Sequence, residues 1–561
     1  MKTKKIFYFL LLLGFLSGCD YLDIVPDNLP TLEMAFNNKS SAERFLFTCY
    51  SFVPEHGKIG TDPGMDVGDE VWYYSDNSAD YSNKTTFWIA KGMQNSNEPL
   101  VDYWNGTQWG KAMFVGIRDC NVFIENIDKV PDLSAYDKET WKAEVKVLKA
   151  FYHFWLMRMY GPIPIVKENI PVSADENEVR VVRDKIDDIV AYTVSLIDES
   201  VDYLPLNIQN EAAEMGRITR PAAKAIKAKI LAFAASPFFN GNLDYANFKN
   251  ADGEPFFNQV YDGEKWTKAA EACLDAIQCA EEAGHGLYEF VNMSSTKLSE
   301  ETVLSLTNRC KVTERWNKEL VWGCGQSGIR DLQVLCQPWL ESNYSSDDRY
   351  HNARNGTFAP TLAVAETFYT KNGVPMDEDR SYDYDNRYTT QVATEADKYY
   401  IQPGYTTAKL HFDREPRFYA TLGFDGSSWY GIGKMDDNDM WYLQAKAKQA
   451  SGKRGNTLYS ITGYFAKKLV RYQNAMVPAS IQIETYPFPI IRLADLYLLY
   501  AEALNEAKKD EGTVPEDCYT YIDKVRVRAG LKGVKDSWRL YANDVSKPNT
   551  CLLYTSDAAD E

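Results

Sequence analysis

Apolar residues recur at helical spacing in two parts of the chain, and the long stretch between them lacks that period. Residues three and four positions apart form apolar faces, which is typical of amphipathic helices. Residues 137–160 carry two such faces, so we expect a helix that packs between neighbours. The helices predicted in the first part cover residues 40–52, 109–127, 137–160, 184–203, 220–235 and 265–283.

Short sequence signals mark the ends of some of these helices. Gly161-Pro162 is expected to end helix 137–160, because glycine suits a left-handed cap and proline cannot continue a helix. Thr219 and Pro221 predict the start of helix 220–235. This helix is rich in alanine, whose small side chain allows close backbone packing. Paired antiparallel helices with small contact residues are typical of tetratricopeptide-like stacking, although no regular repeat period is visible.

Two stretches interrupt the helical pattern. Residues 53–105 mix aromatic residues with glycine, aspartate, asparagine and serine, and long ordered loops of this kind are usually functional. Residues 291–486 combine many turn formers with short β-prone runs, which predicts a loop-rich insertion with small hairpins. Helices return at 492–506 and 515–528. The predicted fold class is therefore mainly α, with a large loop-rich insertion.

The amino terminus has the plan of a secretory signal. Lysines precede an apolar run at residues 6–16, and small residues then precede Cys19. The run is about half of the ~20 residues that a membrane-spanning helix needs. Residues 16–19 resemble the end of a bacterial lipoprotein signal, which implies removal of residues 1–18, acylation of Cys19 and a lipidated tether at 19–35. The alternative is an ordinary cleaved signal followed by a chance cysteine.

Charge and composition exclude several function classes. The formal net charge is -18, with 61 Lys and Arg residues against 79 Asp and Glu residues, and no basic block suggests a nucleic-acid partner. We expect a neutral or weakly charged cargo. The five histidines are scattered and no H-E-x-x-H motif occurs, so neither a metal site nor a cofactor is expected.

The ten cysteines do not form a disulfide framework. They show no C-x-x-C spacing, and apart from Cys19 we expect buried thiols. A disulfide among Cys310, Cys324 and Cys336 is the alternative.

A series of short stretches, spread in order over nearly the whole chain, matches the motifs of one known family. They are Cys19–Asp23, Ala143–Tyr152 with Tyr160–Pro164, Gly216–Arg217 with the alanine helix up to Pro237, Arg414–Phe418 before Asp425–Gly426, Thr462–Tyr464, Ile491–Ala503 and Val525–Leu531. With these stretches the chain resembles the SusD/RagB family, the surface glycan-binding lipoproteins of Bacteroidetes. Each match is weak alone, and their common order makes the resemblance specific.

The resemblance implies one SusD-like globular body over residues 36–550. Its helical, tetratricopeptide-like scaffold would comprise 36–290 and 487–550, and its loop-rich ligand region 291–486. It further implies a cell-surface protein, lipid-anchored in the outer membrane, that binds oligosaccharide or polysaccharide and delivers it to a SusC-like TonB-dependent transporter. Such proteins are not enzymes.

Two other functions stay open. RagB-like relatives handle peptides, so the fold does not fix the cargo. A surface glycoside hydrolase would need two facing carboxyl groups, and no pair stands out among the 79 acids.

The carboxyl terminus departs from the family pattern. Relatives continue after Val525–Leu531 through further helical segments, which contain Glu-Arg-Arg and Glu-Gly-x-Arg patterns. Neither pattern appears in this sequence after Leu531. Residues 551–561 resemble a translated sequencing adapter, so we interpret them as a non-native tail on a truncated gene.

Candidate ligand-binding residues combine aromatic rings with polar side chains. A sugar offers an apolar face and a rim of hydroxyl groups, which suits rigid aromatic platforms beside Asp or Asn. Trp109 is assigned to structure, because it starts an expected helix, and Trp322 is expected to be buried. The predicted ligand-binding residues are Asp69, Trp72, Tyr73, Tyr74, Trp88, Asn97, Trp339 and Tyr344.

Calcium is an alternative role for the first part of this loop. Asp62, Asp66 and Asp69 offer hard oxygen ligands on a flexible segment, but their spacing is not that of an EF-hand, and solvated turn acids are the simpler interpretation.

Overall fold

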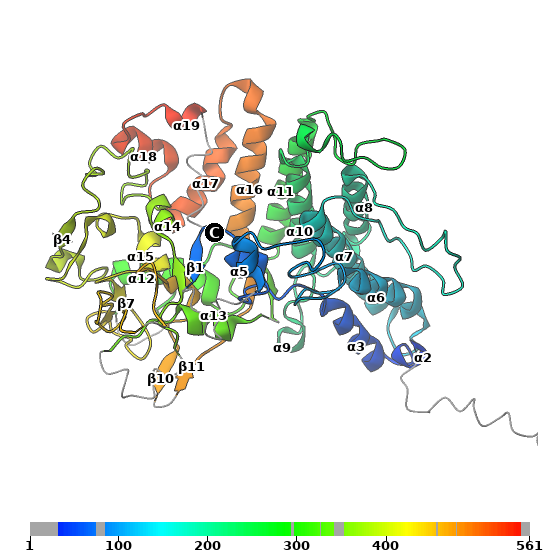
Figure 1. Cartoon of the computed structure of the whole chain (residues 1–561), viewed down its shortest axis with the longest axis horizontal. Helices are drawn as coiled ribbons and strands as arrows, with labels where there is room; N and C mark the ends of the chain where they lie inside the picture. The colour runs from blue at the N-terminus through cyan, green and yellow to red at the C-terminus, as the bar shows by residue number, and fades with distance from the viewer. Residues whose placement is uncertain are drawn as a thin grey trace, which may run out of the picture.

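Paired helices build one side of the molecule and a region of short elements and loops builds the other (Figure 1). The computed structural model describes residues 32–73, 85–292, 297–325, 327–341, 353–455, 458–477 and 480–550. The fold is mainly α, as the sequence predicts. Cys19, the predicted tether up to residue 31 and the predicted tail at 551–561 lie outside the described residues.

The scaffold helices occur close to where the apolar period predicts them. The main difference is at residue 109, because the helix expected there begins only at Met113. A short helix after residue 533 was not predicted. The bounds are α2 Leu32–Ala35, α3 Lys39–Tyr50, α6 Met113–Asn126, α7 Ala135–Tyr160, α8 Ile186–Asp198, α9 Glu211–Glu214, α10 Arg220–Ala235, α11 Glu264–Glu282, α16 Leu493–Ala507, α17 Glu516–Arg528, α18 Val534–Tyr541 and α19 Lys547–Thr550.

Successive scaffold helices pack side by side across the molecule (Figure 1). Helix α7 lies between α6 and α8, and both of its apolar faces are buried. The Ser134 hydroxyl caps its start by accepting the Asp137 N–H at 3.0 Å, and Gly161 ends it at φ 68°. Helix α10 packs on α11, and its alanines are almost fully buried, which allows the close approach that the sequence predicts.

The insertion contains more helix than the sequence suggests. Helix α12 has 14 residues, and most of its second half is buried, polar side chains included. Because it is enclosed by other segments, it lacks the single apolar face by which an amphipathic helix is recognised. The remaining helices are α4 Pro63–Asp66 and α5 Thr85–Ala90 before the insertion, and α12 Glu300–Thr313, α13 Ile329–Cys336, α14 Leu362–Thr367 and α15 Pro416–Thr421 within it.

The strands form small antiparallel pairs. Two pairs join distant segments: β2–β12 brings the two ends of the insertion together beside the scaffold, and β1–β3 ties the loop after α4 to the insertion. The pairs are β1 Val71–Tyr73 with β3 Phe358–Pro360, β2 Leu320–Cys324 with β12 Phe488–Arg492, β4 Thr390–Val392 with β5 Thr406–Ala408, β6 Leu422–Gly423 with β9 Phe465–Ala466, β7 Ser428–Trp429 with β8 Trp441–Tyr442, and β10 Ala475–Val477 with β11 Ser480–Gln482.

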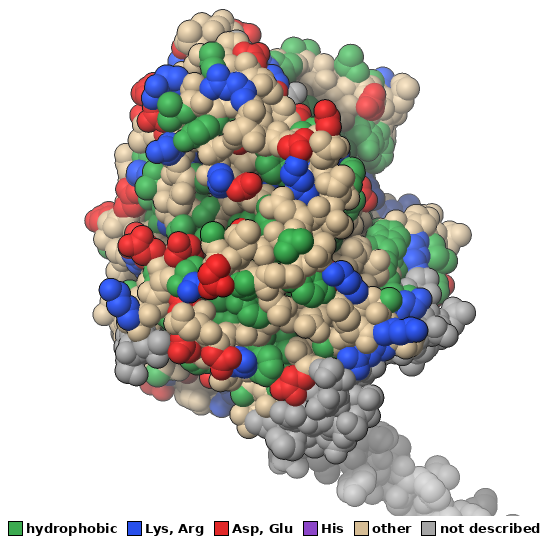
Figure 2. All heavy atoms as spheres, turned by 90° about the vertical axis from the view of Figure 1, so that its left-hand side faces the viewer, with side chains coloured by type: hydrophobic (Ala, Val, Ile, Leu, Met, Phe, Trp, Pro, Cys, Tyr) green, Lys and Arg blue, Asp and Glu red, His purple; other side chains and the backbone are tan. Residues whose placement is uncertain are grey.

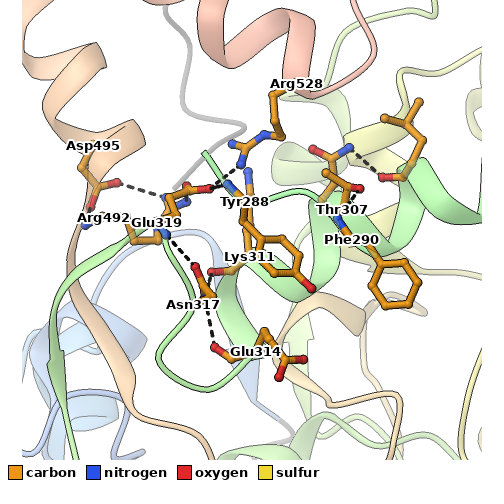
Figure 3. A network of polar contacts seen from close by, with 12 residues as sticks. Tyr288, Phe290, Thr307, Lys311, Glu314, Asn317, Glu319, Arg492, Asp495 and Arg528 are labelled. Carbon is orange, nitrogen blue, oxygen red and sulfur yellow. Dashed lines mark hydrogen bonds and ion pairs between the residues drawn. The ribbon is translucent and has the colours of Figure 1, made fainter. Parts of the chain in front are cut away.

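A buried carboxylate, Glu319, lies where scaffold and insertion meet (Figure 3). Its Oε1 accepts from Arg492 Nη1 at 2.9 Å, and its Oε2 accepts from Arg528 Nη1 at 2.6 Å. Oε2 also accepts the Tyr288 N–H at 2.8 Å. Nε and Nη2 of Arg528 have no hydrogen-bond partner in the described part of the chain. The positive charge of Arg528 is therefore compensated by Glu319.

The eight cysteines in the described part of the chain are all buried. Cys310, Cys324 and Cys336 are buried thiols, so the expectation of buried thiols is confirmed for them and the disulfide alternative is wrong. Trp322 is 3% exposed, as predicted. Among the described residues, none of the helices is both long enough and apolar enough to traverse a bilayer.

We expect Glu319→Gln to lower the free energy of unfolding by about 3–5 kcal/mol, because it leaves the buried Arg528 guanidinium without its carboxylate. Urea denaturation measures the change. Glu199→Gln is the control: Glu199 pairs with Lys146 at 2.8 Å on the surface, and its loss should cost less than about 1 kcal/mol. Equal destabilisation by the two variants would contradict the role of Glu319.

Two buried histidines should make stability depend on pH. Burial lowers the pKa of His153 to about 4 and that of His411 to about 3. Both are neutral in the folded chain, whereas the unfolded chain takes up protons at about pH 6.5. Their contribution to stability is therefore complete above about pH 6.5 and is lost as the pH falls toward the folded pKa values.

The free energy of unfolding should consequently fall between pH 6.5 and pH 4.5 less steeply in His153→Asn than in the wild type. The expected difference is up to about 1.4 kcal/mol per pH unit. Denaturant titrations at several pH values measure both slopes, and His411→Asn offers an independent repeat. Identical slopes for all three proteins would show that these histidines are not protonated on unfolding.

Candidate functional site

The segment from Asp62 to Ala112, described except for residues 74–84, contains only the short elements α4, β1 and α5. Asp62 begins it as the cap of α4, and its carboxylate accepts the N–H groups of Gly57 at 2.8 Å and Gly64 at 3.0 Å. His56 Nδ1 lies 3.7 Å from the same carboxylate. Both oxygens are thus used within the protein, and the described residues hold no cluster of acids, histidines and cysteines that fits a metal ion.

The predicted site residues next to β1 have different surroundings. The Asp69 side chain is exposed. The backbone carbonyl oxygen of Asp69 accepts from the Thr361 hydroxyl at 3.0 Å. Trp72 is half-buried, with its ring edge-to-face against Phe87 at 4.9 Å. Tyr73 is 1% exposed and packs against the same Phe87 ring at 5.0 Å. Tyr73 is therefore part of the interior.

The remaining predicted residues are also divided between surface and interior. Trp88 on α5 is 37% exposed, and Asn97 lies exposed in the following turn. Trp339 is 7% exposed, and its Nε1 donates to the Ala353 carbonyl at 3.1 Å. Because this indole is enclosed and hydrogen-bonded, we give it a structural role. Tyr74 and Tyr344 lie outside the described residues.

Trp109 is the most exposed tryptophan in the described part of the chain, at 73%. The prediction that it starts a helix is wrong: it lies at φ 71° on a turn, and α6 begins four residues later. That helix start carries no side-chain cap, so its position has no sequence signal. Gly106 and Gly110, close to Trp109 on either side, are the loop signal that could have identified it.

The tip that carries Trp109 is polar as well as aromatic. Asn105, Thr107 and Gln108 are exposed beside it, and Gln108 Nε2 donates to Glu98 Oε1 at 3.0 Å. An exposed indole with neighbouring amide and hydroxyl groups matches the two kinds of surface that a sugar ring presents.

The base of this loop is fixed to the scaffold. The Tyr103 N–H donates to the Tyr160 hydroxyl at 2.8 Å, which ties the loop to the end of α7. The Trp104 ring packs edge-to-face on Phe114 of α6 at 4.8 Å, and the Arg183 guanidinium lies 5.1 Å from its centre. The tip therefore projects from a rigid support.

A buried aspartate, Asp102, holds the tip together. Its carboxylate accepts from the Trp104 N–H at 2.8 Å and from the Asn105 N–H at 3.1 Å. Burial raises its pKa, but the hydrogen bonds from Asn105, Thr107 and Trp104 outweigh burial and leave the pKa below its usual value. The side chain is therefore an anion at neutral pH and can accept hydrogen bonds at both oxygens.

Charge is distributed without a dominant sign over the face of the insertion. Figure 2 shows this face, at the left of Figure 1, with Lys and Arg side chains interspersed among Asp and Glu. Such a surface provides no continuous positive track for a nucleic acid.

Two family models match the chain. Residues 331–552 match the model described as the SusD family, and residues 20–231 match one described as starch-binding associating with outer membrane. No curated protein matches this sequence.

Solved structures show the same fold. The structure titled BT4246 has a TM-score of 0.74 at 26% identity, covering 89% of this chain and 83% of that chain. The SusD-like protein BF3747 from Bacteroides fragilis has a TM-score of 0.64 at 17% identity, covering 93% and 83%. A SusD-like carbohydrate binding protein from the same species, BF0978, has a TM-score of 0.55 at 20% identity, covering 89% and 80%.

Proposed function

This chain belongs to the SusD/RagB family of carbohydrate-binding, outer-membrane-associated proteins, and on that premise we propose that it captures an oligosaccharide or polysaccharide at the cell surface. The observation that carries the proposal is the exposed Trp109 indole on a loop fixed to the scaffold. Trp88, exposed in the same segment, is the second aromatic of the proposed ligand surface.

Recognition in this proposal is by shape and stacking rather than by covalent chemistry. A rigid indole offers a large flat apolar surface to the C–H face of a sugar, while the exposed amides of Asn97 and Gln108 supply hydrogen-bonding groups for its hydroxyls. The net charge of -18 agrees with a neutral ligand, because an anionic polymer would be repelled. The protein is accordingly proposed to bind its ligand without hydrolysing it.

The remaining steps of the proposal concern location and partner. Acylation of Cys19 would anchor the chain in the outer membrane, and two or more acyl chains suffice for stable attachment. A SusC-like TonB-dependent transporter would receive the captured glycan. These steps rest on the family and on the lipoprotein-like amino terminus.

A glycan array scored beside a peptide panel tests the ligand class. The wild type should bind at least one glycan series, and Trp109→Ala should weaken that binding about tenfold or more, since stacking contributes about 1.4 kcal/mol. Trp88→Ala should weaken it less, because more of its ring is buried.

Tyr136→Ala is the matched control, since this exposed aromatic lies on the first turn of α7 rather than in the loop. Binding to peptides alone would overturn the glycan proposal and favour a RagB-like cargo. Release of reducing sugar from a bound glycan would overturn the proposal that the protein binds its ligand without hydrolysing it.

Surface anchoring has its own test. Protease treatment of intact cells should degrade the wild-type protein, and a fatty-acid label should enter the wild type but not Cys19→Ala. Full protection from protease would place the protein on the periplasmic side, and labelling of Cys19→Ala would show that the lipid is attached elsewhere.

A further inference from the structure

We infer that Asp102 is a positioning residue for ligand binding: its buried carboxylate fixes the loop tip in the conformation that presents Trp109 to solvent. The inference rests on the proposed function, since it identifies the group on which the affinity of the Trp109 platform depends.

Hydrogen bonds from residues 104–107 converge on Asp102, which is 2% exposed. Besides the N–H groups of Trp104 and Asn105, its carboxylate accepts from Asn105 Nδ2 at 3.1 Å and from the Thr107 hydroxyl at 3.0 Å. The backbone of Asp102 adds two bonds, donating to the Thr107 carbonyl at 3.1 Å and accepting the Gly106 N–H at 3.0 Å. Residues 104–107 are thereby closed around a buried anion.

The tip needs this support because its backbone is strained. Val101, Gln108 and Trp109 lie at φ 49°, 48° and 71°, in the left-handed region that costs about 1 kcal/mol or more for a residue with a side chain. Gly110 has no space for a side chain, since a Cβ there would lie 2.1 Å from the Asp102 carbonyl oxygen. Without the carboxylate, the strained residues would relax and Trp109 would lose its fixed orientation.

Part of the base of the loop is held independently of this carboxylate. The Trp104 ring packs on Phe114 and lies beside the Arg183 guanidinium, and these two contacts involve none of the Asp102 oxygens. The Tyr160 hydroxyl, which accepts the Tyr103 N–H, also interacts with the Asp102 side chain. Loss of the carboxylate should therefore release the tip and leave the helices unchanged. A tip that is already ordered binds more tightly, because the ligand does not have to offset the entropy of fixing it.

A double-mutant cycle separates positioning from general stability. The probe is the soluble oligosaccharide that gives the strongest wild-type signal on the glycan array, and calorimetric titration measures its dissociation constant. Asp102→Asn keeps the size of the side chain but turns an amide donor toward the donors of Asn105 and Thr107. It should weaken binding about tenfold, the effect of losing hydrogen bonds to a charged acceptor.

In a Trp109→Ala background, Asp102→Asn should have no further effect, because Asp102 acts through that indole. Asp175→Asn is the matched control: Asp175 also accepts backbone N–H groups in a loop, from Asn177 at 2.7 Å and Glu178 at 3.2 Å, and its loss should leave affinity unchanged. Thr107→Val removes one donor to Asp102 and serves if Asp102→Asn does not fold; it should weaken binding in the same direction.

The outcomes are distinguishable from failure of the proposed function. A wild-type protein that binds no glycan overturns that function. If the wild type binds and Asp102→Asn binds equally well, the inference is wrong and the function stands. An additional loss from Asp102→Asn on top of Trp109→Ala would show that the carboxylate acts by another route, and unchanged binding by Trp109→Ala would place the ligand elsewhere.

Discussion

The architecture depends on a carboxylate that is removed from water, Glu319, and on the two arginines that compensate it. Burying charges is costly unless their partners are placed correctly, so only one arrangement of the surrounding segments is acceptable. Arg492 is the cap that precedes α16, Arg528 ends α17, and Glu319 precedes β2. Meeting at one point, they fix how the insertion closes on the scaffold (Figure 3).

The helical scaffold supplies the stiffness that a ligand loop needs. The alanines of α10 let it approach α11 closely, and α7 is buried on both faces between α6 and α8. The loop that carries Trp109 takes its anchors from this part of the molecule, through Tyr160 at the end of α7 and Phe114 on α6. A regular, well-packed body thus supports an irregular, strained tip, which is how binding residues are commonly presented.

The loop that carries Trp109 and the core use buried carboxylates for different purposes. Glu319 accepts mainly from guanidinium groups and joins distant segments, whereas Asp102 accepts from its own loop and shapes a few neighbouring residues. A carbohydrate-binding surface benefits from the second arrangement, because a fixed indole stacks on a sugar without first being ordered. In a family that shares one fold over varied cargo, local loop chemistry of this kind is where specificity would differ.

The sequence by itself determined the elements whose burial follows a simple period. Apolar spacing located α3, α7, α10, α11, α16 and α17 within a few residues, since each presents a continuous apolar face or an alanine-rich contact. Local signals also sufficed where the chain supplies them, as at Thr219 and Gly161. The ordered set of motifs identified the family because most of its residues lie in helices of this kind, chiefly α7, α10, α16 and α17.

Only the tertiary structure decided which aromatic residues face solvent. Tyr73 and Trp339 look like surface platforms in sequence, but distant segments cover them: β3 pairs with the strand of Tyr73, and Ala353 accepts the Trp339 indole N–H. Trp109 was assigned to a helix that begins later, because the start of α6 has no cap to mark it. Exposure depends on contacts between residues far apart in the chain, and periodicity reports only on neighbours.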